Sequence, residues 1–111
     1  GLKVDHDQRG EARQLPAVVD LAAYRILQEA LTNAQKHGTG TAALTVEYRT
    51  GQVAVQVVNH AGTPGTTSGY GLLGMRERAS AAGGTLHAGR RPDGCFQVRA
   101  VLPAPAPKEQ P

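Results

Sequence analysis

The sequence predicts an α+β fold, a two-layer sandwich in which helices cover one face of a mixed, mostly antiparallel sheet. Three observations lead to this fold class. Several short segments alternate apolar and polar residues, as half-buried strands do. Two segments instead repeat apolar residues at helical spacing. Most strands are joined by short turns and therefore pair as hairpins, so the helices between them share one face of the sheet.

The chain opens with a strand and a long helix. Leu2, Val4 and His6 alternate with the charged residues at positions 3, 5 and 7, and this period of two predicts a strand. The helix is expected to begin at Pro16, because proline is tolerated in a first helical turn. Apolar residues then recur at helical spacing to about His37, and Gly38 and Gly40 are expected to end the helix.

A hairpin and a long loop form the middle of the chain. Residues 44–49 and 53–58 both alternate, and Gly51 lies between them, so they predict an antiparallel pair with one buried face. Residues 59–70 are rich in Gly, Thr, Ser and Pro, which is typical of a loop.

The last part of the chain predicts a short helix and a second hairpin. Residues 72–82 form the helix, and residues 85–89 and 96–102 form strands around the turn signal Asp93-Gly94. The Pro- and Ala-rich segment 104–111 is expected to be a disordered tail.

Composition limits what the protein can be. The 111 residues are enough for one domain, which we place at residues 1–103. A net charge of +3 with scattered basic residues does not indicate a nucleic-acid surface, and the Arg90-Arg91 pair fits a solvated turn better. The single Cys95 excludes an internal disulfide. No long apolar run or signal peptide is visible, so we expect no direct membrane contact and a cytoplasmic location.

The first candidate site lies late in the long helix, in the segment QEALTNAQKH. Glu29, Asn33 and then Lys36 or His37 stand at i, i+4 and i+7 or i+8, which places them on one helical face. A carboxylate, a neutral oxygen donor and two potential cations can hold a hydrated metal ion and a polyphosphate. The alternative is that this stripe is simply the wet side of an amphipathic helix.

The second candidate site is the glycine-rich segment GYGLLGMRERA that runs into the short helix. Gly69 and Gly71 let backbone N–H groups approach a ligand closely, and Tyr70 stands between them. Leu72 begins a helix, and a helical N-terminus attracts anions. This segment could hold phosphates without any charged side chain, although a glycine loop before a helix is often only a turn.

Taken together, in this order and at this separation, the two segments resemble the N box and G2 box of histidine kinase catalytic domains, in the GHKL ATPase superfamily. The sequence "QEALTNAQKHG … GYGLLGMRERASAAGG" looks most like that of the NarL/DesK class of bacterial sensor kinases. The resemblance implies the Bergerat ATP-binding fold and the cofactors ATP and Mg²⁺. It places the nucleotide between the helices and the loop 59–70.

The resemblance also implies roles for the residues of the helix. Asn33 would ligate Mg²⁺, and a carboxamide does so without adding negative charge beside a triphosphate. Glu29 would accept hydrogen bonds from metal-bound water or act as a base, and the bland alternative is a surface pair with Arg25. Lys36 and His37 would lie near the phosphates, or serve only as cations at a helix C-terminus.

The adenine site is where the sequence departs from the family pattern Asp-x-Gly-x-Gly. Asn59 takes the place of the Asp, Ala61 that of the first Gly and Thr63 that of the second, with Gly62 a possible substitute. A neutral amide loses the charge assistance of a carboxylate, which costs on the order of 1 kcal/mol. We therefore expect weaker nucleotide binding, not its loss.

The resemblance implies a kinase that binds ATP or ADP and passes the γ-phosphoryl group to a histidine on a separate dimerisation and phosphotransfer domain. A response regulator would be served through the full-length kinase. None of the four histidines lies in a suitable acceptor motif, so this segment is expected to bind nucleotide without autophosphorylating. Two alternatives stay open: an anti-sigma-factor serine kinase of the same fold, and a degenerate nucleotide-binding interaction module.

Overall fold

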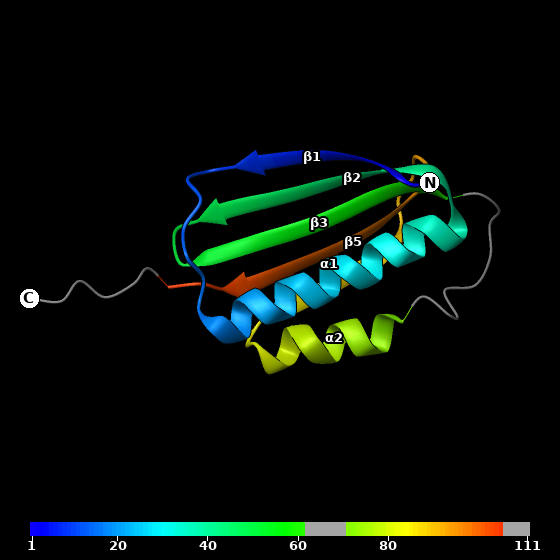
Figure 1. Ribbon diagram of the computed structural model, residues 1–111. Coiled ribbons are helices and arrows are strands. Elements are labelled where there is room, and N and C mark those ends of the chain that lie inside the picture. Colours follow the sequence, from blue (N-terminus) through cyan, green and yellow to red (C-terminus); the bar gives the residue numbers. More distant parts are fainter. Residues whose placement is uncertain (62–70, 106–111) are drawn as a thin grey trace, which may run out of the picture.

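A computed structural model describes residues 1–61 and 71–105 (Figure 1). The sheet has five strands in the order β1-β2-β3-β5-β4, and both helices lie on the same face of it. This is the predicted two-layer α+β architecture. The elements follow one another along the chain as β1 (Lys3–Arg9), α1 (Ala17–His37), β2 (Gly38–Arg49), β3 (Gln52–Ala61), α2 (Leu72–Ala81), β4 (Thr85–Arg90) and β5 (Cys95–Pro103).

The sheet is mixed because its first connection is a helical crossover. β1 and β2 are parallel, with α1 between them in sequence, as a parallel pair requires. The other neighbouring pairs, β2·β3, β3·β5 and β4·β5, are antiparallel. Gly51, at the turn between β2 and β3, has a φ of +74°, a conformation that glycine adopts without strain.

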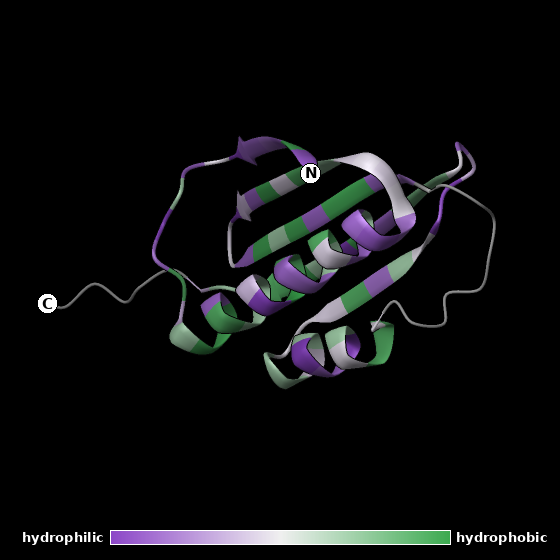
Figure 2. Ribbon diagram, turned by 45° about the vertical axis from the view of Figure 1, so that its right-hand side comes forward, coloured by the Kyte–Doolittle hydropathy of each residue, from purple (hydrophilic) through white to green (hydrophobic). Residues whose placement is uncertain are grey.

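The core lies between the helices and strands β2 to β5. Bands of opposite hydropathy alternate along the central strands, whereas β1 is hydrophilic over most of its length (Figure 2). Every residue of β1 is exposed, since the strand stands at the edge of the sheet and the core is formed by the other elements. The largest fully buried side chains are Phe96, Ile26, Met75, Leu102, Val53, Val55 and Val57.

Arg13 fastens the segment before α1 to the end of the sheet. Its Nη2 donates to the carbonyl oxygens of Arg49 at 2.8 Å and Ala104 at 2.7 Å. The guanidinium also lies over the ring of Tyr48, 5.9 Å from its centroid. These contacts fix where α1 begins relative to β2, and thereby the height at which its polar residues stand above the sheet.

The structure corrects several predicted boundaries. β1 continues to Arg9, two residues further than expected, because its parallel ladder with β2 continues to Glu47. β2 begins at Gly38, well before the predicted residue 44. Gly38 is therefore extended (φ −96°) and does not close the helix with a left-handed turn. The helix α1 ends where the chain enters strand β2, and not at a left-handed glycine.

The ordered chain also passes the predicted domain boundary at residue 103. Ala104 is fully buried, and its N–H donates to the carbonyl oxygen of Gly51 at 2.9 Å. The rest of the predicted tail, residues 106–111, lies outside the described part of the chain.

Candidate functional site

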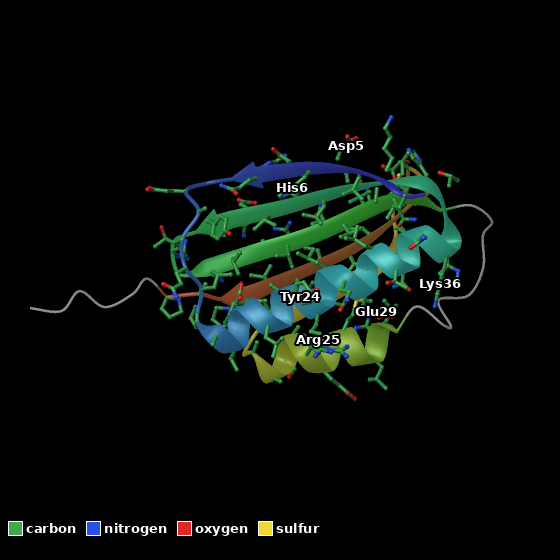
Figure 3. The ribbon with its side chains drawn as sticks, viewed as in Figure 1. Asp5, His6, Tyr24, Arg25, Glu29 and Lys36 are labelled. Atoms are coloured by element: carbon green, nitrogen blue, oxygen red, sulfur yellow. The ribbon has the colours of Figure 1, made fainter. Side chains whose placement is uncertain are left out.

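The stripe predicted on α1 lies against the core as well as beside solvent. Asn33 is only 2% exposed and belongs to the buried face of the helix, together with Ala30 and Ala34. Glu29 and His37 are half-buried, and Lys36 is exposed. Figure 3 places Glu29 on the side of α1 that faces α2, and Lys36 near the C-terminal end of the helix. For Asn33, the alternative of a merely wet helical face is therefore wrong.

Polar burial singles out two asparagines. In residues 1–61 and 71–105, the buried polar side chains are Asn33 and Asn59. Burying a side-chain amide is unfavourable unless it is hydrogen-bonded. Both asparagines were candidates for the nucleotide site on sequence grounds, and the structure gives each a buried position that packing alone does not favour.

Glu29 brings the two sequence motifs together. Its carboxylate lies against Gly71: a Cβ added to that glycine would stand 2.6 Å from Glu29 Oε1. Gly71 has a φ of +69°, in the left-handed region that side-chain-bearing residues rarely adopt. The late part of α1 and the start of α2 therefore meet at one point, and the backbone conformation there favours glycine.

The N-terminus of α2 can accept an anion. Gly71 precedes the helix and has no side chain to cap the N–H groups of the first turn. The turn itself contains no acidic residue, and the carboxylate beside it is that of Glu29 from α1. Such N–H groups have no partner within the helix, and the helix dipole favours negative charge beside them. Leu72, the first helical residue, is half-buried and anchors the turn on the core.

Asn59, in β3, lies beside the C-terminal end of α1. It belongs to the helix-covered face of β3, opposite Ala42 and Phe96, and its Nδ2 donates to the carbonyl oxygen of His60 at 3.2 Å. A Cβ on Gly38 would stand 2.7 Å from this nitrogen. This role of Gly38 could not be predicted, because the contact joins residues that are far apart in the chain.

The donor set suits a metal ion that is carried by a nucleotide. Among the described residues, no group of three or more His, Cys, Asp or Glu side chains gathers as a metal cage. Mg²⁺ bound with a nucleotide keeps phosphate and water oxygens and needs only one or two protein ligands. The Asn33 carboxamide, with the Glu29 carboxylate one turn away, fits that requirement.

The roles of the predicted site residues all remain predictions, and the positions of three of them do so as well. Gly62, Gly69 and Tyr70 lie outside the described residues, so their place relative to Asn33 and Asn59 stays a prediction.

Known proteins of similar sequence are sensor kinases. Sensor histidine kinase YxjM of Bacillus subtilis is 39% identical over 89 residues, which make up 78% of this chain and 22% of that protein. LnrJ, a sensor histidine kinase of the same organism, is 35% identical over 92 residues, 77% of this chain and 23% of that protein. The histidine-protein kinase/phosphatase UhpB of Salmonella typhimurium is 39% identical over 90 residues, 78% of this chain and 18% of that protein. This chain belongs to the sensor histidine kinase family, over the catalytic domain.

Solved structures show the same fold. The nucleotide-free catalytic domain of histidine kinase ThkA superposes with a TM-score of 0.75 at 19% identity, covering 94% of this chain and 79% of that one. Full-length ShkA in complex with AMPPNP gives a TM-score of 0.72 at 21% identity, covering 96% of this chain and 26% of that one. No protein-family model matches the sequence.

The chain spans about a fifth of the length of the curated relatives it matches. In the described part of the chain, no helix combines the length and the apolar character that a membrane crossing needs. The NarL/DesK class suggested by the sequence stays a prediction.

Proposed function

We propose that this domain binds Mg·ATP between α1 and the N-terminus of α2. The observation that supports this most strongly is the contact of Glu29 with Gly71, because it joins the polar end of one helix to the anion-accepting end of the other. The phosphates lie at the first turn of α2. Asn33 ligates the metal, and Glu29 accepts hydrogen bonds from metal-bound water. Lys36 and His37, in the last turn of α1, supply positive charge near the polyphosphate.

The adenine end of the nucleotide lies near Asn59. Its side chain is buried beside Gly38, just beyond His37, so the base lies past the C-terminal end of α1. Asn59 and the predicted Gly62 contact the base. The predicted glycines of the second motif, Gly69 with Tyr70, complete the phosphate loop.

The reaction that follows is phosphoryl transfer to a histidine on a dimerisation and phosphotransfer domain outside this chain, in the cytoplasm. When bound, Mg²⁺ neutralises charge on the transferring group. The residues of the chain hold the nucleotide in line with the acceptor, which accounts for most of catalysis in this class of reaction. A response regulator receives the phosphoryl group through the full-length kinase.

Calorimetric titration of Asn33→Ala tests the metal role. The variant should bind ATP more weakly by about tenfold in the presence of Mg²⁺, as expected for loss of one charge-assisted contact. Its affinity without Mg²⁺ should stay unchanged. Gln35→Ala, at an exposed position two residues away, is the matched control and should bind as the parent does. Unchanged Mg²⁺-dependent affinity in Asn33→Ala, with an intact fold, would exclude Asn33 as a metal ligand.

A degenerate interaction module is the second candidate, and the replacement of the usual Asp by Asn59 favours it. The same titration separates the two. An affinity too weak to measure at millimolar ATP, in a folded parent domain, would support the module and contradict the kinase proposal.

A further inference from the structure

Strand β4 forms one free edge of the sheet. It is the last strand in the order β1-β2-β3-β5-β4 and pairs with β5 alone (Figure 2, beside α2). An edge strand presents alternate backbone N–H and C=O groups that have no partner in the sheet, and such an edge can pair with another extended chain.

A groove follows this edge. It has a volume of about 260 Å³ and is lined by four consecutive strand residues, 87–90, together with Arg76, Arg91 and Gln97. Consecutive residues of a strand point to opposite faces of the sheet, so a groove lined by four in a row must run along the strand edge and not over one face. Gly89 leaves open space here, since a Cβ added to it would meet no atom within 4 Å.

The charge along this edge is of one sign. Arg76 from α2, Arg90 and Arg91 line the groove with His87. Asp93, the carboxylate in the turn, lies 3.0 Å from Arg91 and pairs with that cation. The groove therefore suits a negatively charged occupant.

The opposite edge of the sheet is different. β1 carries both acidic and basic side chains along its exposed length, and Arg9 pairs with Asp7 at 3.0 Å within the strand. Mixed charge of this kind discourages pairing with a chain of either sign. The sheet is thus protected at one edge and open to an acidic strand at the other.

We propose that the β4 edge binds an extended acidic peptide segment by strand addition, a function separate from nucleotide binding. Arg90 stands on the helix-covered face of β4, opposite Phe96, and Arg76 comes from the helix on that face. The bound segment therefore carries a carboxylate at every second residue, and these carboxylates lie on the face of the sheet that α2 covers. The residues between the carboxylates are small, because their side chains lie on the opposite face of the sheet, beside His87 and Gly89. The unpaired backbone N–H and C=O groups of the edge favour a peptide over single-stranded nucleic acid, for which His87 is the aromatic ring among the described lining residues.

Pairs of N-methylated peptides test the strand addition. The probe is a labelled peptide of alternating Glu and Thr, with Lys-Thr as the charge control. N-methyl groups on all Glu residues block one edge of the peptide, and N-methyl groups on all Thr residues block the other. Exactly one of these two peptides should lose binding, and alternate amides of residues 85–90 should exchange more slowly in the complex. Equal binding of both methylated peptides, or binding of Lys-Thr as strong as that of Glu-Thr, would overturn the proposal.

Charge reversal locates the site. Arg91→Glu should weaken Glu-Thr binding by about three- to tenfold at low salt, the range for partly exposed charge pairs. Arg9→Glu makes the same change in net charge at the β1 edge and should bind the peptide as the parent does. ATP affinity should be unchanged in both variants, which separates this proposal from the nucleotide site. Equal loss in the two variants, or a single-stranded oligonucleotide that displaces the peptide, would contradict an acidic-peptide site at β4.

Discussion

The two helices are attached to the sheet very differently, although both contribute to the proposed nucleotide site. α1 has 21 residues and packs on β2, β3 and β5, with Ile26 almost fully buried at its centre. α2 has 10 residues and buries only Met75 and Ala79. In the proposed site, Asn33 therefore lies on the firmly packed helix α1. The anion-accepting N-terminus belongs to the less firmly packed helix α2.

This difference has a functional meaning. Elements that bury little apolar area open at lower free energy than the core, and ligand-binding segments are drawn from that part of a protein. A metal ligand must be held within a narrow geometry, whereas a phosphate-binding turn can close around its ligand. We therefore expect α1 to keep its position with or without nucleotide, and α2 to gain protection when nucleotide binds.

The largest expected effect comes from the core under each helix. Ile26→Ala should cost about 2–5 kcal/mol, the range for large-to-small changes in a core. It should expose amides throughout the sheet to hydrogen exchange. Met75→Ala removes a side chain of similar size, but its loss of protection should be confined to α2 and β4. Loss of protection across the whole sheet in Met75→Ala would show that the two helices form one cooperative unit.

The next effect concerns the glycine at which the helices meet. Gly71→Val places a β-branched residue in the left-handed region and pushes its Cβ against Glu29, so nucleotide binding should be abolished. Gly94→Val is the matched control. Its φ is +86°, its surroundings are open, and it lies in the β4–β5 turn. Both variants should lose about 1–2 kcal/mol of stability from backbone strain. Normal ATP binding by folded Gly71→Val would mean that the phosphates lie elsewhere.

A smaller effect is expected at the adenine end of α1. Asn59→Asp restores a charged acceptor for the exocyclic amine and should tighten ATP binding severalfold, by about 1 kcal/mol. It should also improve discrimination against GTP. The variant loses the hydrogen bond from Nδ2 to the His60 carbonyl oxygen, so the free protein should melt slightly earlier. Paired titrations with ATP and GTP measure this, and an unchanged ratio would show that another residue reads the base.

The smallest effect lies in the turn between β4 and β5, on the α2 side of the molecule. The pKa of Asp93 is lowered, first by the hydrogen bond that its carboxylate accepts from the Cys95 N–H at 3.0 Å and then by the Arg91 cation. Because its pKa is lower in the folded protein, the ionised carboxylate stabilises the fold at pH values above the unfolded pKa of about 3.9. This stabilisation is lost as the pH falls through the pKa of the folded protein. The melting temperature of Asp93→Asn should therefore be slightly below that of the parent at neutral pH and equal to it in acid. A constant difference at all pH values would rule out the charge as the cause.

Much of the fold could be predicted because local pattern and tertiary packing agree. The helical repeat of α1 and the alternation in β3 both match the faces that are buried. The start of β2 could not be predicted, because Gly38 to Ala43 carry small residues with little hydrophobic pattern and are drawn into the sheet by pairing with β3 and β1. Ala104 was missed for a similar reason, since its position depends on Arg13 and Gly51, both distant in sequence.

In the candidate site too, local spacing could be predicted from the sequence, whereas contacts between distant residues could not. The spacing of Glu29 and Asn33 indicated a common helical face, and the structure places Glu29 against Gly71. Helical spacing puts Asn33 on the same face as Ile26 and Ala30, but a polar side chain gives no sign that its position is buried. The role of Gly38 beside Asn59 also needed coordinates, because a glycine that makes room for another side chain carries no signal of its own.

The most direct test of the shared site is a residue-resolved titration of the domain with Mg·ATP, followed by ¹H–¹⁵N spectra. The account predicts shifts in the Asn33 side-chain amide and in the backbone amides of residues 71–74, all with the same saturation curve, and increased hydrogen-exchange protection of α2. Saturation with Mg·ATP that leaves both the Asn33 side chain and residues 71–74 unshifted would contradict the account, because the nucleotide would then bind away from the point where α1 and α2 meet.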